Sequence, residues 1–191
     1  METLKERLFA ECDYRMDDET MDRFIASMSE FELKANEPLI PYGAFDSNIY
    51  VLKEGIIRAA FFNGFKEMTS AFGTPGTMMI SYYSFYKDEP SFFKLEACCE
   101  CSIMKLSKQK FLELMRESHD FAQWIAWMSI SQLWLYEKKS AVVNGDAKER
   151  FEALIKNRPE IIEKVSMKII ASYIGVTPQY LSKLKRQFMP K

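Results

Sequence analysis

The sequence contains one histidine, His119, and its seven glycines stand singly rather than in a phosphate-cradling GxGxxG pattern. A single histidine excludes a multi-histidine metal site, and no obvious Ser-His-Asp constellation surrounds it in the sequence. His119 precedes an apolar helical segment, where a surface or capping role is expected. We therefore predict no catalytic residue, no metal and no cofactor, and we do not expect an enzyme.

Long hydrophobic runs are also lacking. The uncharged stretch 121–136 has 16 residues, fewer than the roughly 20 that cross a bilayer. The N-terminus carries Glu2, Lys5, Glu6 and Arg7 where a secretory signal would need an apolar core. These features predict a cytoplasmic protein without a membrane partner.

Cysteines are too few for a disulfide framework: Cys12, Cys98, Cys99 and Cys101 are the only ones. Adjacent residues on a strand point to opposite faces, so only Cys99 and Cys101 would share a face. Buried structural thiols are the preferred interpretation. A metal or iron–sulfur site remains the alternative, and an ultraviolet-visible spectrum of anaerobically purified protein would reveal a cluster.

Charge is unevenly distributed although the net charge is −1. Residues 146–191 carry ten Lys or Arg and five Asp or Glu, and no carboxylate side chain follows Glu163. The remaining residues are acidic overall. A basic end on an acidic body indicates that the C-terminal part meets a polyanion.

The pattern of apolar residues in the first hundred positions changes near Leu33. Residues 1–31 show helical periodicity. Short runs rich in Ile, Val, Tyr and Phe then alternate with glycines, and they predict strands near 48–52, 56–62, 67–72, 91–97 and 101–106. Asn63-Gly64 predicts a type I′ hairpin turn between two of these strands. This pattern is typical of an antiparallel sandwich or jelly-roll barrel.

A long helix is expected at about 120–141, after a shorter helix capped by Ser107. Its apolar residues cover more than the single stripe that one core requires. We expect the same helix of a second subunit to cover the rest, and the alternative is burial inside its own domain. The predicted dimer residues are Phe121, Trp124, Ile125, Met128 and Leu135.

The segment 167–188 carries the strongest signal, after a predicted helix at 146–157 and a turn at Arg158-Pro159. A helix-turn-helix needs a small residue where its helices cross and a residue that accepts positive φ in the turn. Ala171 and Gly175 meet these needs. Apolar residues point into the junction at the required spacing: Ile170, Ile174, Val176, Leu181 and Leu184.

The second helix of this motif begins at Thr177-Pro178, with Thr as N-cap and Pro at the first position. Its outer face has hydrogen-bond donors and no carboxylate, as a polyphosphate surface requires. We expect base contacts from Gln179 and Lys183, then Tyr180 and Ser182, and phosphate contacts from Thr177, Lys185 and Arg186. An ordinary αα-hairpin with a basic face is the alternative.

Taken together, the chain resembles the Crp/Fnr family of bacterial regulators, most of all its short members. The resemblance rests on Tyr50-Val51-Leu52-Lys53-Glu54-Gly55-Ile56-Ile57-Arg58, the strand after Gly64, Ser84-Phe85 with Pro90-Ser91, the long helix and Ala171…Gly175…Leu181-Ser182-Lys183. It implies an α+β fold with three parts: an N-terminal cyclic-nucleotide-binding-like jelly roll (1–118), a long dimerisation helix (119–144) and a DNA-binding helix-turn-helix (145–191).

The chain departs from the family at the expected nucleotide site. With Gly76 aligned, Ile80-Ser81 stands where cyclic-nucleotide binders have Gly-Glu, and Pro90-Ser91 where they have Arg-Ser. A buried phosphate would then lack a charge partner, so we expect no tight binding of cyclic AMP. An apolar effector pocket could instead be lined by Met78, Met79, Tyr82, Tyr83, Phe85, Ser91 and Phe93, or these residues simply fill the barrel.

The function predicted is a homodimeric, sequence-specific transcription regulator that binds a pseudo-palindromic site on double-stranded DNA. Further partners would be an unknown small-molecule effector and, for an activator, RNA polymerase. The alternative is a small-molecule-binding or protein-interaction module that no longer binds DNA.

Overall fold

The computed structural model describes residues 2–142 and 146–188 and begins with two short helices, α1 (Leu4–Ala10) and α2 (Asp18–Ala26). Thr3 and Asp17 cap their N-termini, each through a side chain that accepts a backbone N–H. The predicted helical stretch 1–31 extends too far. The alternating residues Ser29–Leu33 form strand β1, because Phe31 and Leu33 pack against the adjoining β core.

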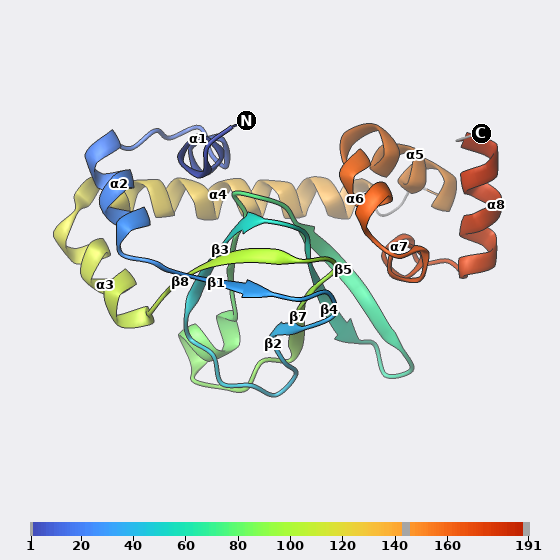
Figure 1. Ribbon diagram of the computed structural model, residues 1–191, viewed down its shortest axis with the longest axis horizontal. Coiled ribbons are helices and arrows are strands. Elements are labelled where there is room, and N and C mark those ends of the chain that lie inside the picture. Colours follow the sequence, from blue (N-terminus) through green and yellow to red (C-terminus); the bar gives the residue numbers. More distant parts are fainter. Residues whose placement is uncertain (1, 143–145, 189–191) are drawn as a thin grey trace.

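Two four-stranded antiparallel sheets follow (Figure 1). One has the order β1–β8–β3–β6, where β8 is Cys101–Leu106, β3 is Ile49–Glu54 and β6 is Met78–Ile80. The other has the order β2–β7–β4–β5, where β2 is Pro38–Ile40, β7 is Phe93–Ala97, β4 is Ile57–Phe62 and β5 is Glu67–Gly73. Residues of both sheets, among them Leu52, Ile57 and Ile103, form one buried core. We call residues 29–106 the β domain.

The turn between β4 and β5 differs from the predicted type I′ turn. Four residues, 63–66, separate the strands, and only Gly64 of the pair Asn63-Gly64 has positive φ. The Asn63 side-chain oxygen accepts the backbone N–H groups of Phe65 and Lys66, at 3.2 and 3.1 Å. This side-chain bonding is an Asx turn, which replaces the backbone geometry that we expected.

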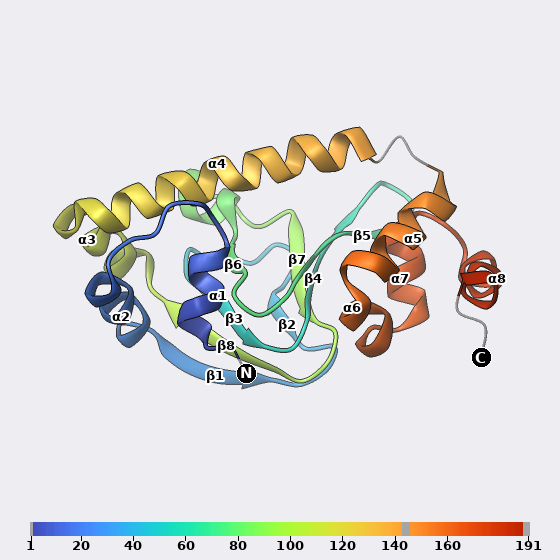
Figure 2. The same ribbon diagram turned by 90° about the horizontal axis from the view of Figure 1, so that it is seen from above.

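The helices α3 (Lys108–Glu117) and α4 (His119–Val142) follow the β domain, and Ser107 caps α3 as predicted. In Figures 1 and 2, α4 runs along one side of the molecule, from α2 and α3 at one end to the C-terminal helices at the other. Its N-terminal half is fixed by a buried cluster that includes Phe24, Phe121 and Trp124. Among the described residues, no helix combines the length and hydropathy of a membrane span.

The structure buries some of the predicted dimer residues of α4 and leaves one of them exposed. Phe121, Trp124 and Met128 are at most 3% exposed and Ile125 is partly buried, all within the protomer's own core. Phe121, Trp124 and Met128 therefore have almost no surface to offer a partner, whereas Leu135 is 46% exposed. The apolar surface that remains open lies on the other side of the helix and includes Trp127, Ile130 and Trp134. Periodicity could not reveal which apolar face meets the protomer's own core.

Four helices form the C-terminal unit within residues 146–188: α5 (Ala147–Asn157), α6 (Pro159–Lys164), α7 (Met167–Ile174) and α8 (Pro178–Phe188). Their buried core includes Phe151, Ile161, Ile170 and Leu181, and the β-domain residue Ile56 is buried with them. Figure 2 shows these helices at the far end of α4. The boundary that we expected near Asn144 lies outside the described residues.

Candidate nucleic-acid interface

The helices α7 and α8 meet through the tight turn that the sequence predicted. Ile170, Ala171, Ile174, Leu181 and Leu184 are all buried between them and the rest of the unit, and Val176 packs against this cluster. Gly175 has φ +80° and ψ +29°, and its N–H donates to the Ala171 carbonyl at 2.9 Å. An added Cβ would meet only Arg150, at 3.9 Å. Gly175 is therefore required for its left-handed backbone and not for lack of space.

Arg150 on α5 holds the end of α7. Its Nε and Nη2 atoms donate to the Ile174 carbonyl oxygen at 3.2 and 3.0 Å. A cation at the C-terminus of a helix also complements the partial negative charge there. Sequence reasoning missed this residue because the contact spans 24 positions and has no local pattern.

The start of α8 is fixed by Thr177, whose side-chain oxygen accepts the N–H of Tyr180 at 3.2 Å. Pro178 occupies the first helical position, where no intrahelical N–H bond is lost. The cap and the proline together set the direction of the exposed helix that follows.

The predicted DNA-contact residues line the outer side of α8. Thr177, Gln179, Tyr180, Ser182, Lys183 and Arg186 are exposed, and Lys185 is half-buried. The Ser182 hydroxyl donates to the Pro178 carbonyl at 2.9 Å, so it can still accept a bond from a ligand. In the described part of the chain, no carboxylate forms a salt bridge with Lys183, Lys185 or Arg186. The face thus presents unneutralised positive charge.

The start of α7 adds two exposed residues that sequence reasoning did not select. Ser166 caps this helix by accepting the Ile169 N–H at 3.4 Å, and Lys168 lies in its first turn. Both line a cleft that also reaches Thr177 and Pro178 at the start of α8. No local sequence pattern could identify these two residues, because Lys168 and Pro178 lie ten positions apart in the chain and line the same cleft only after folding.

The predicted effector-pocket residues lie in different surroundings. Met79 and Phe93 belong to the β core, and Met78 and Phe85 pack against the α4 cluster. Tyr82 and Tyr83 are 65% and 42% exposed, at the start of the short π-helix η1 (Tyr83–Lys87). Ser91 is buried, and its hydroxyl donates to the Phe93 carbonyl at 2.8 Å. The structure does not bring these side chains together around one cavity among those described, and the effector site stays a prediction.

The cysteine run lies where the β domain meets the C-terminal unit. Cys98 and Cys99 pack against the cluster that contains Ile56 and Phe151. Burial raises the pKa of Cys98 to about 12 and that of Cys101 to about 11. Within the described ranges, no three His, Cys, Asp or Glu side chains are grouped as metal ligands. A thiol with so high a pKa is a weak nucleophile at neutral pH.

Several solved structures have the same fold as this chain. The c-di-GMP responsive global regulator CLP of Xanthomonas campestris superposes with a TM-score of 0.69 and 15% identity, over 90% of this chain and 91% of CLP. FixK2 of Bradyrhizobium japonicum gives 0.68 and 16%, over 84% and 83%. The Thermus thermophilus catabolite activator protein gives 0.59 and 17%, over 95% and 85%. No protein-family model and no curated protein matches the sequence.

These structures are Crp/Fnr-type regulators, and the α+β fold that the resemblance predicted is confirmed. The likeness covers 91% of CLP, 83% of FixK2 and 85% of the activator protein. At 15–17% identity it establishes the fold.

Proposed function

We propose that the protein is a homodimeric, sequence-specific DNA-binding transcription regulator. The observation that carries this proposal is the outer face of α8, where Gln179, Lys183 and Arg186 are exposed. Among the described residues, the three cations of this helix form no salt bridge with a carboxylate. The fold similarity to regulators supports it. A dense array of phosphates favours such a surface because each bound cation releases condensed counterions.

Position within α8 assigns the roles. Residues in the first turns of a recognition helix reach base edges in the major groove, and later residues meet the backbone. Gln179 and Lys183 are therefore the proposed base contacts, with Tyr180 and Ser182 beside them. Thr177, Lys185 and Arg186 are the proposed phosphate contacts. We add Ser166 and Lys168, because the first helix of such a motif crosses the DNA backbone.

Dimerisation is proposed through the open face of α4. Gln123, Trp127, Ile130, Trp134 and Glu137 recur at intervals of four, three, four and three residues. This is the spacing of a two-helix seam. Trp127, Ile130 and Trp134 are 43%, 54% and 56% exposed, and a contact between two copies of α4 would bury them. Two subunits would present two recognition helices to a pseudo-palindromic site.

Selection of bound duplexes from a random pool tests the proposal. We expect an enriched pseudo-palindrome, bound with an affinity that falls steeply as salt concentration rises. Lys183→Ala should weaken binding to the enriched site. Lys34→Ala, which removes the same charge from an exposed position on the β domain, is the matched control and should bind as the wild type does.

Two results would contradict the proposal. One is a selected pool without any enriched sequence. The other is an equal effect of Lys183→Ala and Lys34→Ala, which would mean that only net charge matters.

A further inference from the structure

Strand β5 lies at the edge of its sheet, paired with β4 on one side only. The open side of such a strand presents backbone N–H and C=O groups that need partners. Here α7 packs against β5, and Ser172 is the partner of two of these groups. The Ser172 side-chain oxygen accepts the Thr69 N–H at 2.8 Å, and its hydroxyl lies 3.4 Å from the Glu67 carbonyl, to which it donates. We call these three residues the edge contact.

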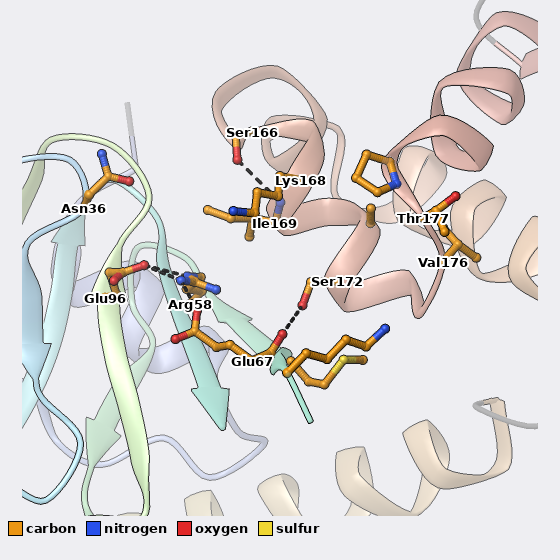
Figure 3. Close-up of a pocket in the computed structure, with 14 residues that line it drawn as sticks. Asn36, Arg58, Glu67, Glu96, Ser166, Lys168, Ile169, Ser172, Val176 and Thr177 are labelled. Carbon is orange, nitrogen blue, oxygen red and sulfur yellow. Dashed lines mark hydrogen bonds and ion pairs between the residues drawn. The ribbon is translucent and has the colours of Figure 1, made fainter. Parts of the chain in front are cut away.

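The two β5 residues of the edge contact are also held from within the β domain. The buried Arg58 guanidinium lies 2.6 Å from the Glu67 carboxylate and 2.5 Å from Glu96, and it donates to the Thr69 hydroxyl at 3.3 Å. Lys94 completes the network, at 3.0 Å from Glu67 and 2.6 Å from Glu96. Figure 3 shows the connected series from Glu96 through Arg58 and Glu67 to Ser172. Bonded groups thus link strands β7 and β4 to α7.

Beside the edge contact, the two parts of the chain are separated by a cleft of about 600 Å³. Arg58, Glu67 and Glu96 line it from the β domain, and Lys168, Ser172 and Thr177 line it from α7 and the start of α8. Other joining contacts are the Phe72 and Tyr173 rings, 5.0 Å apart, and the bond from Arg158 to the Thr74 hydroxyl at 3.0 Å. Apolar packing also joins the two parts, since Ile56, Cys98 and Cys99 contact the C-terminal core. Such packing is non-directional, so the bonds of the edge contact supply a directional restraint on where α7 sits.

We propose that Ser172 is a positioning residue for DNA binding: its bonds to the β5 edge fix the direction in which α8 faces relative to the β domain. This inference rests on the proposed function. In a dimer built on α4, the direction of each α8 determines the spacing between the two half-sites. Ser172 therefore governs spacing, while the residues on α8 govern base preference.

The test uses the full chain with Ser172→Ala. Ser27→Ala is the matched control, because the Ser27 hydroxyl donates only to Arg23 of its own helix. One readout is hydrogen exchange of the Thr69 amide, which needs no DNA. We expect exchange to become about tenfold faster, the factor that corresponds to one hydrogen bond of ordinary net strength. The control should exchange as the wild type does.

The second readout is affinity for duplexes that contain the selected half-site once, or twice at the selected spacing or at spacings changed by one or two base pairs. Ser172→Ala should lose about tenfold at the selected spacing, by the same reasoning, and should bind the single half-site as the wild type does. Its preference for one spacing should flatten. Ser172→Thr and Ser172→Val introduce side chains of nearly equal size, of which only threonine has a hydroxyl. The threonine variant should retain the preference for the selected spacing, and the valine variant should lose it.

An unchanged Thr69 exchange rate would overturn the inference, as would equal losses on the single half-site and at every spacing. Faster exchange with an unaltered spacing preference would overturn the positioning role. Failure of the wild type to bind any selected duplex would instead defeat the proposed function, so the two failures are distinguishable.

Discussion

Arg150 and Ile174 are joined by two hydrogen bonds, in which the guanidinium of α5 meets the last carbonyl oxygen of α7 at 3.2 and 3.0 Å. The next residue, Gly175, turns the chain toward α8. A cation distant in the sequence therefore stabilises the position at which the direction of α8 is set.

Arg150→Ala should lower the free energy of unfolding by about 1–3 kcal/mol, since it removes charge-assisted bonds from a partly buried carbonyl. Chemical denaturation followed by circular dichroism measures this loss. Arg150→Lys, which keeps the charge and can keep one bond, should lose less. Equal stability of the alanine variant and the wild type would show that Ile174 finds another donor.

Lys183 and Lys185 should behave differently although both are cations on α8. Lys183→Ala should relax base preference and cost about 1–3 kcal/mol on the selected site, because a base contact is lost. Lys185→Ala should weaken binding to all sequences alike and reduce the salt slope by about one, because a phosphate contact is lost. Titrations of selected and scrambled duplexes at two salt concentrations measure both. If the two variants behave identically, the assignment of a base contact to Lys183 and a phosphate contact to Lys185 is wrong.

Ile130→Glu should convert a dimer into a monomer, because it would place like charges opposite each other on the proposed α4 seam. Light scattering coupled to size-exclusion chromatography measures the mass. Ser129→Glu is the control, since Ser129 is an exposed neighbour outside the four-three spacing, and this variant should remain dimeric. A dimer that survives Ile130→Glu would place the interface elsewhere.

Acidification should weaken the network around Arg58. Although burial raises the pKa of Glu67, hydrogen bonds from Lys94 and Arg58 bring it below its ordinary value of 4.5. A lowered folded-state pKa contributes stability above pH 4.5, and this contribution is lost as the pH falls through the folded-state value. The stability difference between the wild type and Glu67→Gln should therefore be largest near neutral pH and shrink below pH 4.5. Denaturation at a series of pH values measures it, and a constant difference would contradict it.

Cyclic AMP should bind weakly or not at all. At the positions that departed from the family pattern, the Ser81 and Ser91 side chains are buried and bonded within the chain, to Ser84 and Phe93. Neither residue offers a cation to a cyclic phosphate. Isothermal titration calorimetry should show no micromolar binding, and a micromolar dissociation constant would refute the prediction.

The sequence by itself predicted the elements whose causes are local. The Ser107 cap, the left-handed Gly175 and the Thr177-Pro178 start of α8 all depend on neighbours within a few residues, and each lies where it was expected. The sequence also predicted the carboxylate-free face of α8, because helical periodicity determines which residues share a side. Two local predictions were wrong. The helical stretch ends before strand β1 begins at Ser29, and in the Asn63-Gly64 turn the Asn63 side chain supplies bonds that backbone preferences do not predict.

Tertiary structure decided which of several competing surfaces each residue meets. α4 is apolar on opposite sides, and only packing against Phe24 and its neighbours assigns Phe121 and Trp124 to the protomer's own core and leaves Trp127 and Ile130 open. The contacts of Arg150 with Ile174 and of Ser172 with β5 join positions 24 and about a hundred residues apart. Periodicity along one helix contains no information about a partner so distant, so these contacts exist only once the chain is folded.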